Sequence, residues 1–196
     1  MLVEVWSDVV CPWCHVGKAR FEDAVRRLGW EDEVEVVYRP FELPPRPPGY
    51  RPPGNALDRI AAAGEDLGLT FDWAAAKRRS TFDAHRLLAW ALDTAGSKAQ
   101  GRLKTRLMQA YFAEGVDVSD RGELLRLAGE VGLDVAGVVD SDAYADVVRA
   151  GEAEAAELDI YAVPTFVFER SLVVPGAQDP QTFASILARM RERLAT

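Results

Sequence analysis

The N-terminal part of the chain shows two kinds of apolar pattern in succession. Leu2 to Val10 is an almost continuous apolar run, which is typical of a buried β-strand. From about Trp13 to Leu28 the apolar residues recur three and four positions apart, as on one face of a helix. Glu33 to Phe41 then carries three valines, which predict a second strand. Together these segments predict a βαβ unit.

The middle of the chain begins with a proline-rich connector, which neither a helix nor a central strand would tolerate. Its prolines are Pro44, Pro45, Pro47, Pro48, Pro52 and Pro53. From about Asn55 to Leu158 nearly every segment has helical spacing, including Phe82 to Ala95 and an apolar face from Leu103 to Phe112. Asp120 and Glu123 form the pattern of a capping box at the start of another helix. We expect an all-helical insertion here.

Strand patterns return near the C-terminus. Tyr161 to Phe168 and Leu172 to Val174 predict two short strands joined by a turn. A final helix is predicted by an apolar face with helical spacing, formed by Phe183, Ile186, Leu187, Met190 and Leu194. Residues 1–45 and 159–196 therefore combine as βαβ plus ββα, which is the order of a thioredoxin fold. We expect an α/β domain in two halves, interrupted by a helical domain over residues 46–158.

Composition narrows the possible functions. The 196 residues are 48% hydrophobic and 28% charged, which is enough to bury a sizeable core. The formal net charge of -8 argues against a nucleic-acid partner and against an anionic membrane surface. The first residues lead into a strand without the basic segment and apolar stretch of a secretory signal. We therefore expect a cytoplasmic protein.

The chain's 2 cysteines lie close together in Cys11-Pro12-Trp13-Cys14, at the predicted junction of strand and helix. Proline is favoured at the first helical position, so Cys11 lies at a helix N-terminus. The partial positive charge there favours the thiolate and lowers cysteine pKa values from roughly 8.5 to about 3.5–7.5. Cys11 is the predicted nucleophile. Cys14, on the same helix face, can attack a mixed disulfide formed on Cys11 and release the substrate.

The same residues match the patterns of other chemistry. With His15, the pair also matches the C-x-x-C-H pattern of covalent haem attachment. A zinc site would need Cys11, Cys14, His15 and His85 to converge, and the sequence holds no second pair of ligands at metal-binding spacing. A purely structural disulfide is disfavoured because so short a loop removes little unfolded-state entropy. We expect neither a metal nor an organic cofactor, only a redox-active Cys11-Cys14 disulfide with possible exchange with glutathione.

With these motifs in order, the chain resembles the DsbA family of thioredoxin-like oxidoreductases, and most closely its cytoplasmic FrnE-like branch. The resemblance spans nearly the whole chain and implies that Cys11 attacks, that Cys14 resolves, and that Pro164 is a cis-proline facing the dithiol. An extended substrate would then lie along Val163, next to Pro12 and Trp13. Besides the cysteine motif, the residues that carry the resemblance are Ser7-Asp8, Val16-Gly17-Lys18, Arg39-Pro40-Phe41-Glu42-Leu43, Ala84-His85-Arg86-Leu87, Ala110-Tyr111-Phe112, Val163-Pro164-Thr165-Phe166 and Gly176-Ala177-Gln178.

Three further residues are open candidates. Asp8 could take a proton from Cys14 during resolution, or could simply cap a turn. His15 stands where many relatives have an aromatic residue, which leaves open whether a cation there tunes the thiol. His85 could act in catalysis or could be a histidine satisfied between domains.

These observations favour a thiol-disulfide oxidoreductase, with isomerisation as a further activity that the dithiol could support. Its partners would be protein or small-molecule disulfides and thiols, and a cellular thiol reductant or oxidant. One alternative is a glutathione-dependent transferase or isomerase of the kappa or hydroxychromene-carboxylate type, although those proteins generally carry a serine at the position of Cys11. The other alternative is a noncatalytic redox sensor. The sequence leaves the oligomeric state open.

Overall fold

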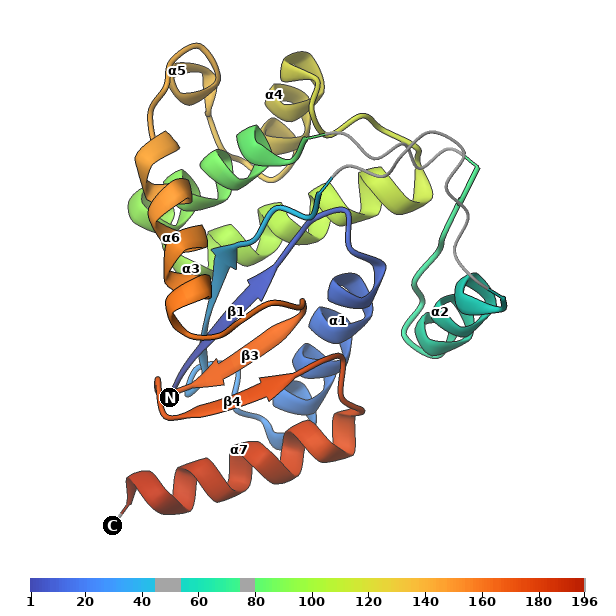
Figure 1. The fold of residues 1–196 in the computed structure, drawn as a ribbon, viewed down its shortest axis with the longest axis vertical. Helices are drawn as coiled ribbons and strands as arrows, with labels where there is room; N and C mark the ends of the chain where they lie inside the picture. The colour runs from blue at the N-terminus through green and yellow to red at the C-terminus, as the bar shows by residue number, and fades with distance from the viewer. Residues whose placement is uncertain (45–53, 75–79, 196) are drawn as a thin grey trace.

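The computed structural model describes residues 1–44, 54–74 and 80–195. In this part of the chain the strands form a mixed sheet in the order β2-β1-β3-β4 (Figure 1). The central strand β1 (Leu2–Ser7) pairs in parallel with β2 (Glu35–Pro40) and antiparallel with β3 (Thr165–Phe168). The hairpin partner of β3 is β4 (Leu172–Pro175). Two segments more than 150 residues apart in sequence, β1 and β3, are therefore adjacent strands.

One face of the sheet is covered by α1 (Pro12–Leu28) and α7 (Pro180–Leu194), which also pack against each other. Phe21 from α1 and Phe183 from α7 meet at 5.2 Å between ring centroids, and both contact Phe166 of β3. Asp179 caps α7 by accepting a hydrogen bond from the Thr182 amide. This layer confirms the predicted βαβ plus ββα arrangement.

The remaining helices lie between β2 and β3 in sequence and confirm the predicted helical insertion. They are α2 (Ala56–Glu65), α3 (Phe82–Ala113), α4 (Arg121–Glu130), α5 (Ala136–Val139) and α6 (Ala145–Glu157). Figure 1 shows α4 and α5 at the end of the molecule opposite α7. The helix α3 is kinked at Gly96, whose φ of 81° is outside the helical region. Asp120 caps α4, as the sequence predicts, by accepting from the Glu123 amide.

Two contacts hold the helical part against the sheet. Gln100 of α3 is buried and pairs with the edge strand β2, receiving the Tyr38 N–H at 2.8 Å and donating to the Tyr38 carbonyl at 2.8 Å. On the face opposite α1, α6 approaches β2 so closely that a β-carbon on Gly151 would lie 2.6 Å from Pro40 Cγ. Trp6 donates to the Gly151 carbonyl at 3.3 Å. The edge of the sheet is thus paired and covered by the insertion.

Element boundaries differ from the sequence predictions at the ends of strands. β1 ends at Ser7 and not at Val10, because Asp8 turns the chain and accepts a hydrogen bond from the Leu43 amide at 2.8 Å. β3 begins at Thr165, since the predicted residues before it form the connection that contains Pro164. The proline-rich connector lies outside the described residues apart from Pro44.

Candidate functional site

Cys11 and Cys14 lie where β1 ends and α1 begins. Cys11 is the N-cap residue, with extended backbone angles (φ -91°, ψ 113°), and Pro12 takes the first helical position. The carbonyl of Cys11 accepts from the Cys14 and His15 amides at 3.0 and 3.1 Å, so the first turn is anchored on the backbone of Cys11. Its side chain makes no capping hydrogen bond. The thiol therefore remains available for chemistry at the positive end of the helix.

The two thiols are unbonded to each other and differ in their ionisation. A hydrogen bond from the Cys14 thiol lowers the pKa of Cys11 and outweighs the opposing effect of burial. Burial, together with the hydrogen bond and the charge of Cys11, raises the pKa of Cys14 well above its ordinary value. Because Cys14 is 1% exposed and Cys11 6%, both thiols are largely enclosed by the protein. The surroundings thus favour the ionised form of Cys11 over that of Cys14.

The loop before β3 brings Val163 and Pro164 to the dithiol. The Val163-Pro164 peptide bond is cis, and the Cys11 thiol lies 3.7 Å from the Val163 carbonyl oxygen. Among the described residues, no group accepts a hydrogen bond from the Val163 N–H. Pro164 is buried, and its carbonyl accepts from the Gly176 amide at 2.7 Å. Trp13 is half-buried and packs against the core of the helical part.

Asp8, which follows β1, and His85 of α3 lie close together. Both are buried, and Asp8 Oδ1 lies 3.4 Å from His85 Nε2. Burial acts to raise the pKa of Asp8, but hydrogen bonds and the charge of His85 outweigh it, so its pKa is lower than usual. The second carboxylate oxygen of Asp8 receives the Leu43 amide. The structure therefore shows Asp8 fixing the turn and linking β1 to α3, where His85 lies.

The ring of His15 packs into an aromatic cluster. Its ring stacks on Phe112, with centroids 5.4 Å apart, and meets the edge of Phe71 at 5.9 Å. Burial, with a smaller effect of the Lys18 charge, lowers the pKa of His15 to about 4. The imidazole is therefore neutral at neutral pH, and no cation stands beside the thiols at this position.

The sequence interpretation missed Lys104, which is fully buried on α3. Its ammonium donates to the Ser7 carbonyl at 3.2 Å, at the end of β1. Lysine is almost never fully buried without a partner, so this position is unusual. The signal was present in the sequence, because Lys104 shares a helix face with Met108 and Tyr111, at i+4 and i+7. A lysine within an apolar helix face indicates a buried cation.

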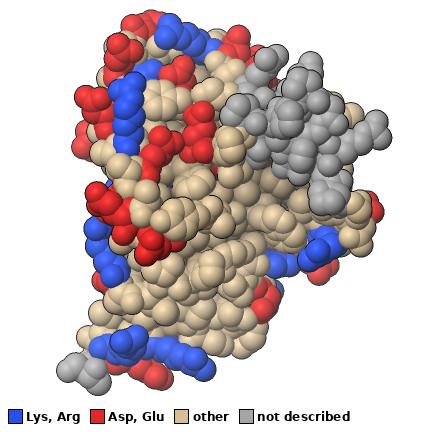
Figure 2. Space-filling model, in the orientation of Figure 1, with Lys and Arg blue, Asp and Glu red and all other residues tan. Residues whose placement is uncertain are grey.

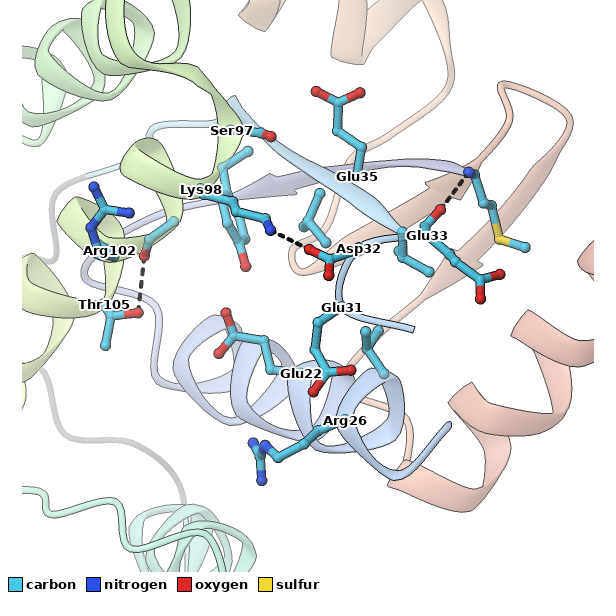
Figure 3. A pocket seen from close by; sticks show the side chains of 16 residues that line it. Glu22, Arg26, Glu31, Asp32, Glu33, Glu35, Ser97, Lys98, Arg102 and Thr105 are labelled. Carbon is cyan, nitrogen blue, oxygen red and sulfur yellow. Dashed lines mark hydrogen bonds and ion pairs between the residues drawn. The ribbon is translucent and has the colours of Figure 1, made fainter. Parts of the chain in front are cut away.

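A large cleft lies apart from the two cysteines. A cleft of about 740 Å³ lies between α1, the start of β2 and α3, bridged by the Lys98–Asp32 ion pair at 2.6 Å (Figure 3). Neither cysteine lines it.

Residues 1–44, 54–74 and 80–195 contain no cluster of three His, Cys, Asp or Glu side chains suited to a metal ion. No helix in the same residues is long and apolar enough to cross a membrane.

The surface around the start of β3 is largely uncharged. Figure 2 shows uncharged residues across the middle of this face, over β3 and β4, with carboxylates gathered over α6. Exposed apolar side chains include Tyr161, which precedes β3 and is 75% exposed, and Val173 of β4. An uncharged surface of this kind is suited to contact with another macromolecule.

A buried dithiol at the start of α1, facing the Val163-Pro164 loop on a thioredoxin fold, defines the class of a thioredoxin-like oxidoreductase. The DSBA-like thioredoxin domain family matches residues 2–188, and the chain belongs to this family. The crystal structure described as a probable DsbA oxidoreductase, SCO1869 from Streptomyces coelicolor, is 37% identical, with a TM-score of 0.82 over 96% of this chain and 89% of that one. The protein YwbO of Bacillus subtilis (strain 168) is 34% identical over 198 residues, covering 95% of both chains.

A second similar structure is the cytosolic disulfide reductase DsbM from Pseudomonas aeruginosa. It is 20% identical, with a TM-score of 0.73 over 99% of this chain and all (100%) of that one. At this identity the likeness shows the shared fold. The family membership is established by the domain match and by the two relatives with higher identity.

Proposed function

We propose that the protein is a thiol-disulfide oxidoreductase that cycles between the Cys11-Cys14 dithiol and disulfide. The observation that carries this proposal is the placement of Cys11: its thiol has a lowered pKa and lies 3.7 Å from the Val163 carbonyl. A thiol whose lowered pKa favours the nucleophilic thiolate thereby lies beside a backbone segment whose N–H, among the described residues, makes no hydrogen bond and can pair with an extended chain. Cys14 follows on the same helix face as the second thiol.

The chemistry proceeds in two exchanges. The Cys11 thiolate attacks one sulfur of a substrate disulfide. The S–S bond of the substrate breaks, its other sulfur leaves as a thiolate, and the attacked sulfur stays in a mixed disulfide with Cys11. Cys14 then loses its proton and attacks the Cys11 sulfur. The Cys11-Cys14 bond forms, the bond to the substrate breaks, and the second substrate sulfur leaves with the electron pair. The dithiol is oxidised by two electrons and the substrate is reduced, and each step is reversible.

The substrate class is a protein or small-molecule disulfide, or a thiol when the cycle runs in reverse. An extended peptide segment fits beside Val163, and the uncharged surface over β3 and β4 favours a protein substrate. Glutathione is a suitable exchange partner or reductant for a cycle that needs no bound organic cofactor. Cytoplasmic location and membership of the FrnE-like branch stay part of this proposal.

The decisive test uses the two single variants Cys11→Ser and Cys14→Ser. Cys11→Ser should abolish turnover of an insulin or glutathione disulfide substrate, whereas Cys14→Ser should still attack and accumulate a mixed disulfide, visible by mass spectrometry. Iodoacetamide at mildly acidic pH should label Cys11 before Cys14 in the reduced protein. Faster labelling of Cys14 would reverse the assigned roles.

Two other functions predict different results for the same variants. A hydroxychromene-carboxylate isomerase shares this fold at 15% identity and a TM-score of 0.74. A glutathione-dependent isomerisation that survives Cys14→Ser would favour that class and contradict the oxidoreductase proposal. A redox sensor would oxidise and reduce once per event, without steady-state turnover of a disulfide substrate.

A further inference from the structure

The cleft beside α1, shown in Figure 3, lies at the opposite end of β1 from the dithiol. It is formed by α1, the start of β2 and the part of α3 that follows the kink at Gly96, and its volume is about 740 Å³. Met1, which precedes β1, lines it, whereas Cys11 follows the other end of β1. A cleft of this volume suits a small organic molecule. A ligand held here would lie apart from the thiols.

A buried tyrosine that lines the cleft has a hydroxyl without a partner. Tyr38 of β2 is 5% exposed, and its backbone pairs with Gln100. Its ring extends toward α1 and α3, because Lys18 Nζ lies 5.5 Å from the ring centre and a β-carbon on Gly101 would lie 3.8 Å from Cε2. Within residues 1–44, 54–74 and 80–195 the hydroxyl makes no hydrogen bond. Buried hydroxyls are normally paired, so this oxygen is an open position for a ligand atom.

Carboxylates outnumber cations around the cleft. Five carboxylates line it, against three cationic side chains: Glu22, Glu31, Asp32, Glu33 and Glu35. Two of the cations are already paired, Lys98 with Asp32 at 2.6 Å and Arg26 with Asp23 at 3.2 Å, and the third is Arg102. Glu31 is exposed and has no ion-pair partner in the described part of the chain. The cleft therefore favours a positively charged ligand.

The surfaces between these charges suit an alkyl chain that ends in a hydrogen-bond donor. Val25, Val34 and Val36 line the same cleft. Burial, and to a smaller extent the charge of Glu22, raises the pKa of Tyr38 well above its ordinary value, so the hydroxyl is neutral at neutral pH. A neutral hydroxyl oxygen accepts a hydrogen bond from an ammonium group.

We propose that this cleft is a binding site for a small aliphatic diamine. One ammonium group lies beside Glu22 and Glu31 and donates to the Tyr38 hydroxyl oxygen. The methylene chain packs against the valines, and the second ammonium is matched by the further carboxylates of the lining. The inference goes beyond the proposed redox function, because neither thiol takes part in it.

Other ligand classes match the cleft less well. An anion would face the excess of carboxylates, and a purely apolar molecule would leave the Tyr38 hydroxyl unpaired. A metal ion needs several converging ligands, and the part of the chain that the structure describes holds no group of three His, Cys, Asp or Glu side chains that could bind one. An amine satisfies both the charge and the hydroxyl.

The test is an NMR titration of the wild-type protein with diaminopentane, which carries an amine at each end, at about 0.15 M salt. Saturable shifts are expected at the amides of Val36 and Gly101, which line the cleft, and none at Cys14. Pentanediol, of similar length but neutral, and pentanoate, an anion, should give no shifts at the same concentrations. The Cys11→Ser and Cys14→Ser variants should bind the diamine as the wild type does, so the result does not depend on the redox proposal.

Three substitutions test the named contacts. Tyr38→Phe removes only the hydroxyl and should weaken binding about fivefold, the effect of one hydrogen bond; because that hydroxyl has no partner to lose, the variant should fold normally. Glu31→Gln should weaken binding about threefold. Lys98→Met frees the Asp32 carboxylate and should tighten binding about threefold. The control is Glu35→Gln, whose side chain points away from the cleft in Figure 3, and it should leave the affinity unchanged.

The outcomes divide clearly. Selective binding of the diamine, weakened by Tyr38→Phe and tightened by Lys98→Met, would support the site. Equal binding of pentanoate or pentanediol would refute the ligand class. Unchanged affinity in Tyr38→Phe, or equal losses in Glu31→Gln and Glu35→Gln, would show general attraction to an acidic surface and overturn the proposal. The absence of saturable shifts in the wild-type protein would overturn it without any variant.

Discussion

The environment of His15 makes a quantitative prediction about acid stability. The imidazole is 4% exposed, stacked on Phe112 and in edge contact with Phe71, with no partner for a positive charge at hydrogen-bond distance among the described residues. His15→Phe replaces it with a ring that suits the same aromatic cluster and cannot titrate. At neutral pH, where His15 is already neutral, we expect the stability of the variant to be close to that of the wild type.

The size of the effect follows from the change in pKa. Folding lowers the pKa of His15 from 6.5 to about 4, so the unfolded chain binds a proton between these values while the folded protein does not. Stability contributed by neutral His15 is therefore present above pH 6.5 and is lost as the pH falls. At 1.36 kcal/mol per pKa unit, the loss is about 2 kcal/mol between pH 7 and pH 5 and about 3 kcal/mol by pH 4.

Urea unfolding of wild-type and His15→Phe protein at pH 7, 6, 5 and 4.5 measures this term. Other groups titrate over the same range, so the informative quantity is the difference between the two proteins at each pH. The free energy of unfolding of the variant should exceed that of the wild type by about 2 kcal/mol at pH 5. Parallel curves would mean that the imidazole is protonated in the folded protein, and the assignment of a neutral His15 would then be wrong.

Two further substitutions test how the helical part is fixed to the sheet. Gln100→Leu should lower the free energy of unfolding by about 2–4 kcal/mol, because it leaves the buried N–H and carbonyl of Tyr38 on the edge strand unpaired. Gln109 is exposed on the same helix, and Gln109→Leu should have little effect on stability. Gly151→Ala should destabilise the folded protein by about 1–3 kcal/mol, since the added β-carbon would overlap Pro40. Gly129 lies in open space on α4, so Gly129→Ala should leave the stability unchanged or increase it. Equal effects within either pair, by chemical denaturation, would contradict these contacts.

The sequence determined the features that depend on local spacing. Apolar residues three and four apart predicted the buried face of α7, and Phe183, Leu187 and Met190 are indeed in the core. The motif Asp120-x-x-Glu123 predicted the start of α4, and Pro12 predicted that α1 begins directly after Cys11. These features follow from backbone hydrogen bonding over a few residues, which neighbouring side chains largely control.

The tertiary structure decided what lies next to the dithiol and which groups there carry charge. Val163 is 152 residues from Cys11 in sequence, and only the pairing of β3 with β1 brings its carbonyl to the thiol. Burial makes His15 neutral and raises the pKa of Cys14, an effect that the charge of Lys104 opposes. A sequence gives the type of each ionisable group, whereas its pKa depends on desolvation and on charges from distant segments, and these exist only once the chain has folded.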